Sequence, residues 1–147
     1  FIYGTRVVTT PFLGELTLLN VNETVDFLLI PISGTKIFPK ISELKTKIVD
    51  SRLNSSDWKL YAYINNPLKS TNGFILDDAL VFKKLDDEII TLNTTPKIVY
   101  NGSDNKGNVS YNDITWSREK GPLLNLTNDA LEVNEEYFAT IYFSIEE

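Results

Sequence analysis

The sequence predicts an all-β domain, and two of its features carry this prediction. Short runs of β-branched and aromatic residues recur along the 147 residues, and Gly, Pro, Asn and Asp separate them about every 8–12 residues. No segment has a persuasive helical period. We therefore expect one β-sandwich of immunoglobulin-like or Greek-key type, or a flattened barrel, with about ten short strands.

The composition fits a single domain that spans residues 1–147, with residues 1–11 as an N-terminal extension strand. Apolar residues make up 42% and charged residues 23% of the chain, as in ordinary globular proteins. No window approaches the roughly 18–20 apolar residues of a membrane-spanning helix, so we expect no membrane insertion. The net charge of −6 argues against nucleic acid as a partner, because phosphate groups repel it.

The strands expected in the first half of the chain share β-branched or aromatic residues bounded by turn residues: residues 1–10, 14–21, 24–32, 36–38, 41–50 and 58–64. In residues 41–50 (ISELKTKIVD), helical and alternating spacings compete, and the β-branched residues at the end favour a strand. In residues 58–64 (WKLYAYI), Trp58 and Leu60 share one face.

The second half has the same character. Residues 73–82 (GFILDDALVF) should form two short strands around a turn at Asp77-Asp78. The other strands expected there are residues 89–92, 97–100, 113–117, 123–126 and 137–145. In the last of these, every second residue from Tyr137 to Ile145 faces one side.

Neither catalysis nor metal binding is expected. The chain has no Cys and no His, which removes thiolate ligands and the commonest general base. The acidic runs Asp77-Asp78, 86–88 and Glu135-Glu136 suit solvated turns. Residues 103–108 (SDNKGN) lack the closing Glu of a calcium loop and suit a hairpin loop with Gly107 at positive φ. We predict no enzyme activity, no cofactor and no metal site.

Four segments, in this order, resemble the WxL domain of Gram-positive cell-surface proteins: residues 12–27 (FLGELTLLNVNETVDF), 48–60 (IVDSRLNSSDWKL), 73–82 (GFILDDALVF) and 137–147 (YFATIYFSIEE). The second segment holds the Trp-x-Leu motif Trp58-Lys59-Leu60, after Asp50 and Arg52. In the last segment, Phe143-Ser144-Ile145 takes the place of the second Trp-x-Leu motif and departs from it at both defining positions. The resemblance covers residues 12–147.

The resemblance implies a secreted, extracellular protein of the bacterial surface that is attached non-covalently to the cell wall, with peptidoglycan as its ligand. It makes Trp58, Leu60, Phe143 and Ile145 the candidate binding positions. The composition agrees with secretion, because the chain is rich in Lys, Asn and Ile, has no Cys and opens at Phe1 rather than Met.

A packing role for the same residues stays open. Residues two apart in a strand share a face, so the pairs Trp58/Leu60 and Phe143/Ile145 also suit the core between two sheets. We expect Trp58 to be largely buried. We expect Asp50 and Arg52 to pair or to bind nearby backbone groups.

Residues outside the resemblance indicate a second function, that of a structural subunit of an extracellular filament or surface layer. Phe1, Ile2, Tyr3, Val7 and Val8 belong to a terminal strand that could add to a sheet edge of another surface protein, or of another copy to give a homo-polymer. Residues 1–75 hold 8 Lys/Arg against 6 Asp/Glu, and residues 76–147 hold 6 against 14. This asymmetry suits head-to-tail contact, although solvated loops explain it more simply.

Overall fold

Fourteen strands and no helix make up the part of the chain that the structure describes, residues 2–9, 16–20, 24–28, 35–52, 56–127 and 136–147 of a computed structural model. None of these residues therefore belongs to a helix that could cross a membrane. The predicted all-β class is confirmed, and the sheets are arranged as a sandwich or flattened barrel.

The first layer is a seven-stranded sheet. Its continuous order is β11 (Lys97–Gly102), β6 (Trp58–Ile64), β14 (Tyr137–Glu146), β1 (Ile2–Thr9) and β3 (Thr24–Leu28). Beside them, β7 (Leu68–Ser70) pairs with the start of β14 and with β8 (Ile75–Leu76). The N-terminal strand β1 runs parallel to β14 and antiparallel to β3, so it lies between two strands of its own chain.

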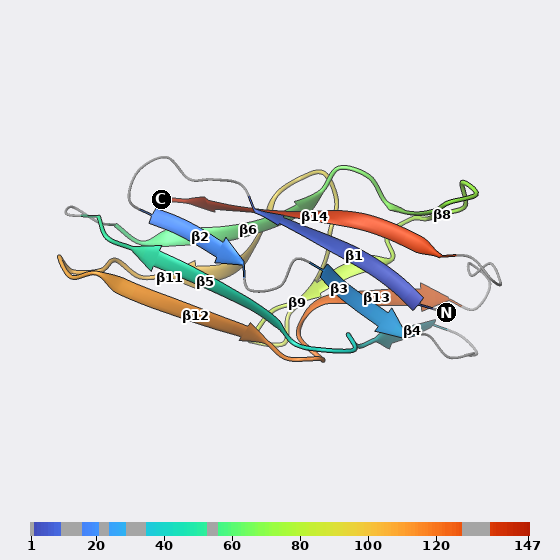
Figure 1. Ribbon diagram of the computed structural model, residues 1–147, viewed down its shortest axis with the longest axis horizontal. Coiled ribbons are helices and arrows are strands. Elements are labelled where there is room, and N and C mark those ends of the chain that lie inside the picture. Colours follow the sequence, from blue (N-terminus) through green and yellow to red (C-terminus); the bar gives the residue numbers. More distant parts are fainter. Residues whose placement is uncertain (1, 10–15, 21–23, 29–34, 53–55, 128–135) are drawn as a thin grey trace.

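The second layer is divided into two smaller sheets. One has the order β10 (Ile89–Thr91), β9 (Leu80–Lys83), β13 (Gly121–Thr127) and β4 (Thr35–Phe38), and the other β12 (Ser110–Trp116), β5 (Leu44–Asp50) and β2 (Leu16–Asn20). β4 leads into β5, and β12 leads into β13. Because β4 pairs with β13 and β5 with β12, the two sheets are halves of one ladder, interrupted at residues 39–43 and 117–120. In Figure 1, β12 and β13 follow one another along the side of the molecule opposite β14.

Lys40 fills this interruption, and its side chain is fully buried. The Lys40 backbone N–H donates to the Arg118 carbonyl at 2.9 Å. Its Nζ donates to the carbonyls of Ser117, at 2.5 Å, and of Lys120. Burial lowers the pKa of the Lys40 amine to about 7, because desolvation disfavours the charged form. The corner of the second layer is therefore held by one buried amine.

A glycine completes the corner. Gly121 has a φ of 71°, and a Cβ there would lie 2.9 Å from Cβ of Trp116. Only glycine satisfies both the left-handed backbone and this close approach. The chain can therefore turn from β12 into β13 while Trp116 stays in the core.

Aromatic rings join the three sheets in a common core. The Phe82 ring of β9 lies edge-on to Trp116 of β12, with centroids 4.9 Å apart, and to Phe143 of β14, with centroids 6.2 Å apart. These three side chains are fully buried and come from the three different sheets. Edge-to-face ring pairs add to the free energy gained from burial alone.

Trp58 lies opposite a glycine of the neighbouring strand, so no side chain faces the indole at that position. Trp58 and Gly102 are register partners in β6 and β11. A Cβ on Gly102 would lie 1.8 Å from Cε2 of Trp58, so the indole covers the glycine backbone. The Tyr100 ring lies beside the indole at 5.7 Å. The predicted burial of Trp58 is confirmed, since its side chain is 0% exposed.

Most strands lie where the sequence predicts them, with shifted ends. Residues 41–50 form a strand from Leu44 onward, and residues 73–82 form β8 and β9 around a turn in which Asp78 has a φ of 55°. β7 was not predicted, because three residues after Pro67 are too few to show a period. Parts of three predicted strands lie outside the described residues: residues 1 and 10 of the first, residues 14–15 and 21 of the second, and residues 29–32 of the third.

We predict that Gly102→Ala destabilises the protein through Trp58. The added methyl collides with the buried indole, and overpacking of this kind costs about 1–3 kcal/mol in the free energy of unfolding. Denaturant unfolding of Gly102→Ala, Trp58→Phe and the double variant would measure the coupling. Gly102→Ala should lower the free energy of unfolding less in the Trp58→Phe background, because the Phe ring is smaller than the indole. An equal cost in both backgrounds would contradict this account.

We predict that Lys40→Met lowers the stability by about 1–3 kcal/mol, because the Lys120 carbonyl loses the amine as its donor and the Ser117 carbonyl keeps only the Lys120 N–H. It should also change the pH dependence. The Lys40 amine titrates near pH 7 in the folded protein and at 10.5 as an ordinary solvated lysine. Between these values the unfolded chain binds more protons, so raising the pH favours the folded state by up to about 1.4 kcal/mol per pH unit.

Denaturant unfolding of both proteins from about pH 7 to about pH 9 measures this contribution. The wild type should gain stability relative to Lys40→Met over this range. Parallel stability curves for the two proteins would show that Lys40 does not titrate there.

Candidate functional site

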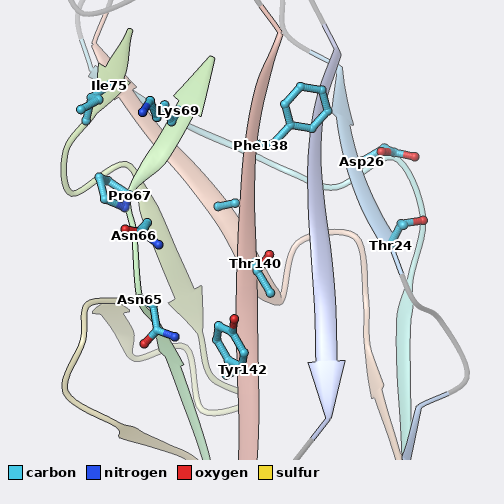
Figure 2. Close-up of a pocket in the computed structure, with 11 residues that line it drawn as sticks. Thr24, Asp26, Asn65, Asn66, Pro67, Lys69, Ile75, Phe138, Thr140 and Tyr142 are labelled. Atoms are coloured by element: carbon cyan, nitrogen blue, oxygen red, sulfur yellow. The ribbon is translucent and has the colours of Figure 1, made fainter. Parts of the chain in front are cut away.

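A groove of about 760 Å³ runs across the outer face of the seven-stranded sheet. Figure 2 shows it spanning from β3, which carries Thr24 and Asp26, across β14 to the segment after β6. Its lining residues come from strands and turns far apart in the chain: Thr24, Asp26, Asn65, Asn66, Pro67, Lys69, Ile75, Phe138, Ala139, Thr140 and Tyr142. It is a site that only the folded sheet assembles.

The register of β1 explains why this face is hollow. Gly4 is the register partner of Asp26 on one side and of Phe138 on the other. A glycine at this position puts no side chain between them. The Phe138 ring leans from β14 toward β1 in Figure 2. Asp26 and Phe138 therefore lie on either side of a strand position that has no side chain.

Two exposed apolar side chains line the groove on either side of Lys69. Phe138 is 48% exposed and Ile75 is 52% exposed, although both belong to strands of the sheet. Lys69 is the register partner of Phe138 on one side and of Ile75 on the other, and Figure 2 shows the two apolar side chains apart. Water solvates these side chains less favourably than the polar groups of the groove.

Tyrosines form the far end of the groove. Tyr142 of β14 and Tyr63 of β6 are register partners, and their rings stack at 5.3 Å with an interplanar angle of 16°. Both are half-buried, so their positions are fixed by packing while part of each ring stays accessible. Tyrosine combines an apolar ring with a hydroxyl group, which suits ligands that have both characters.

Polar groups surround these rings. Asn65 and Asn66 offer amide donors and acceptors, and Thr24 and Thr140 offer hydroxyl groups. Figure 2 places Asp26 and Lys69 on opposite sides of the groove. The groove can thus contact an uncharged ring system and, at its two sides, a cationic and an anionic group.

The four motif residues lie elsewhere. Trp58, Leu60, Phe143 and Ile145 are all buried in the core. The sheet brings the two motifs together, because Leu60 and Ile145 are register partners in β6 and β14. A surface ligand does not reach these side chains in this structure. Their position assigns them to packing between the layers.

Asp50 and Arg52 form a buried ion pair, as expected. Arg52 Nε lies 2.8 Å from Asp50 Oδ1, and Arg52 Nη2 lies 2.9 Å from Asp50 Oδ2. These hydrogen bonds from Arg52 hold the pKa of the Asp50 carboxyl below its ordinary value. A two-point contact of this kind fixes the guanidinium plane as well as its position.

The pair connects three distant parts of the chain. Arg52 Nη2 donates to the Ser56 carbonyl at 2.9 Å, and Nη1 lies 2.9 Å from Oε1 of Glu147. The Asn105 amide donates to the Arg52 carbonyl at 2.8 Å. The ion pair is therefore part of the scaffold below β6 and β14, and it lies away from the groove residues.

The loop at residues 103–108 differs from its prediction. Gly107 has the expected positive φ, at 83°. The loop is no hairpin, however, because β11 and β12 belong to different layers. Asn105 bridges the layers with its side chain, donating to the β5–β6 segment and accepting from the Gly107 N–H at 2.9 Å. Among the described residues, no three acidic side chains come together as a metal site would require.

One acidic turn adjoins the groove, because Asp77 and Asp78 line a smaller cavity of about 180 Å³ that shares Asn65, Asn66 and Pro67 with it. Asp77 and Asp78 are exposed in the turn between β8 and β9. Asp87 pairs with Lys120 across a neighbouring turn. Glu136 is exposed, and Glu135 lies outside the described residues.

The residues proposed for assembly belong to β1, apart from Phe1, which lies outside the described residues. Ile2, Tyr3, Val7 and Val8 occupy a strand that is paired on both sides within the chain. The predicted terminal strand is therefore present, and here it completes its own sheet.

Part of the groove could be anticipated from the sequence. The outward face of residues 58–64 carries Tyr61 and Tyr63 rather than plainly polar residues, and Tyr63 flanks the groove end. The rest of the site depends on the parallel placement of β1 and on the short strands β7 and β8. Neither was visible in a local pattern.

We predict that Arg52→Met lowers the free energy of unfolding by about 3–5 kcal/mol, because it leaves the buried Asp50 carboxylate without its partner. Lys45→Met provides the matched control, since Lys45 pairs with Glu43 at 3.9 Å on the surface. That exposed pair should contribute less than about 1 kcal/mol. Similar losses for both variants in denaturant unfolding would contradict a structural role for the Arg52 network.

Comparison of the chain with models of known protein families gave no match, and comparison with curated proteins found no relative.

Proposed function

We propose that this chain is a non-catalytic domain of a Gram-positive cell surface that binds the peptidoglycan cell wall non-covalently. The groove on the seven-stranded sheet is the observation that carries the proposal. It combines exposed apolar side chains, stacked tyrosines and amide groups on one accessible face.

The chemistry of peptidoglycan complements this groove. Its glycan consists of N-acetylated sugar rings, which have apolar faces, hydroxyl groups and amides. Phe138 and Tyr142 can pack against such faces, and Asn65 and Asn66 can bind the amides. Its peptide stems carry carboxylates and amines, which match Lys69 and Asp26 on the two sides of the groove.

The resemblance to WxL domains supports the same function, but with the motif residues in a structural role instead of in contact with the ligand. We propose that its motif residues build the sheet that carries the groove. Trp58 and Leu60 fix β6 in the core, and Phe143 and Ile145 fix β14 beside it. The outward faces of these same two strands supply Tyr63 and Tyr142. In this proposal the motif positions act on binding indirectly, and the protein is secreted to the cell wall.

The proposal predicts that Phe138→Ala combined with Asn66→Ala weakens wall binding by about tenfold or more, which corresponds to about 1.4 kcal/mol. Both side chains are exposed, so the fold should tolerate their removal. The measurement is co-sedimentation of the purified chain with insoluble peptidoglycan sacculi over a range of sacculus concentrations.

Tyr111→Ala is the matched control. Tyr111 is an aromatic residue of β12, in the other layer, and is 66% exposed, so its removal should leave wall binding unchanged. If the wild type sediments no more than an unrelated β-sandwich, the proposal fails. If Tyr111→Ala weakens binding as much as the groove variant, the groove is not the binding surface.

A further inference from the structure

β1 differs from the other described strands in its pairing. It is the first strand of the chain and pairs with β14 from Gly4 to Thr9. Among the described strand pairs, this one alone is parallel. Parallel pairs are slightly less stable per residue than antiparallel ones, and Gly4 further weakens the strand interior. β1 is therefore a comparatively replaceable member of its sheet.

The strands on either side of β1 have attachments that do not involve it. β14 pairs with β6 from Ile141 to Glu146 and with β7 at its start. β3 buries Val25 and Phe27 in the core, and its Asp26 carbonyl accepts a hydrogen bond from the Ile41 N–H at 2.9 Å. Removal of β1 would leave a slot between two anchored strands, each with an unsatisfied row of backbone groups.

We infer that this slot also accepts β1 of a second copy of the chain. A β1 strand from another copy has the same sequence, so it offers the slot the same register and the same backbone hydrogen bonds as the strand of the chain itself. The closed and exchanged forms then have the same strand pairing, and they differ in which chain supplies β1 and in their dependence on protein concentration. Reciprocal exchange gives a closed dimer, and successive exchange gives a filament.

A copy of the same chain is the partner because β1 is the sequence already paired between β14 and β3. Each copy carries a net charge of −6, so two copies repel each other at long range. Exchange should therefore be faster at higher salt, where this repulsion is screened.

The experiment uses a cysteine pair that reports which chain supplies β1. Thr5 and Ala139 are register partners in β1 and β14, and neighbouring strands bring Cα atoms within the range that disulfides bridge. The chain has no cysteine of its own, so the full-length variant Thr5→Cys/Ala139→Cys forms this disulfide alone. Refolding over a range of concentrations, oxidation and a non-reducing gel then separate links within a chain from links between chains.

The inference predicts dimers or a ladder of covalently linked chains. Their share should rise about tenfold for each tenfold increase in concentration while conversion is low. Lys47→Cys/Asp113→Cys is the control, because it joins register partners of β5 and β12, two strands that do not pair with β1, and it should stay monomeric. If Thr5→Cys/Ala139→Cys fails to fold, Arg6→Cys/Thr140→Cys tests the next register pair.

Intrachain disulfides alone, at every concentration, would overturn the inference. Linked chains in the control as well as in the β1 variant would overturn it too, because the links would then not report exchange of β1. Sacculus binding by the monomeric fraction is independent of this result, so failure here leaves the proposed wall binding untouched.

Discussion

The sandwich depends on a corner that one lysine amine holds in place. Its second layer is a single antiparallel ladder that breaks where β4 meets β5 and where β12 meets β13. At the break, the ladder hydrogen bonds stop, and the Lys40 amine donates to the carbonyls of Ser117 and Lys120. The Ser117 carbonyl also accepts from the Lys120 N–H, so the amine joins the turn at residues 117–120 to the segment after β4. A hydrogen bond that is lost here costs free energy. The bend lets β9 and β12 present Phe82 and Trp116 to each other above β14.

The burial of the Trp-x-Leu residues changes where a ligand can bind. A strand has two faces, and here the motif occupies the inner one. The outer faces of the same strands carry Tyr63 and Tyr142 at the end of a groove. In the proposed function, the residues at the motif positions fix two neighbouring strands in register, while the contact surface is made of residues that no short motif contains.

Much of the fold could be predicted from local patterns, and the reason is physical. Strict alternation in residues 58–64 and 137–145 reflects one buried face, and burial follows it in the structure from Trp58 to Ile64. The Asp50–Arg52 pair was also foreseeable, because opposite charges two residues apart beside a buried strand have few other partners. The corner at Lys40 was not, since a lone lysine usually lies in solvent. The groove was not either, because it depends on which strand lies beside β14 and on a glycine at the right register.

The order of the strands in the larger sheet constrains when the domain can fold. β14 lies at the centre of that sheet, between β6 and β1, and is the last strand of the described chain. Until it is available, β6 lacks one neighbour and β1 lacks its parallel partner. Pairing between the two ends of a chain is slow, because the loop entropy is lost before the contacts form. The larger sheet can therefore be completed only after β14 has been synthesised, whereas the two smaller sheets contain only strands that precede it.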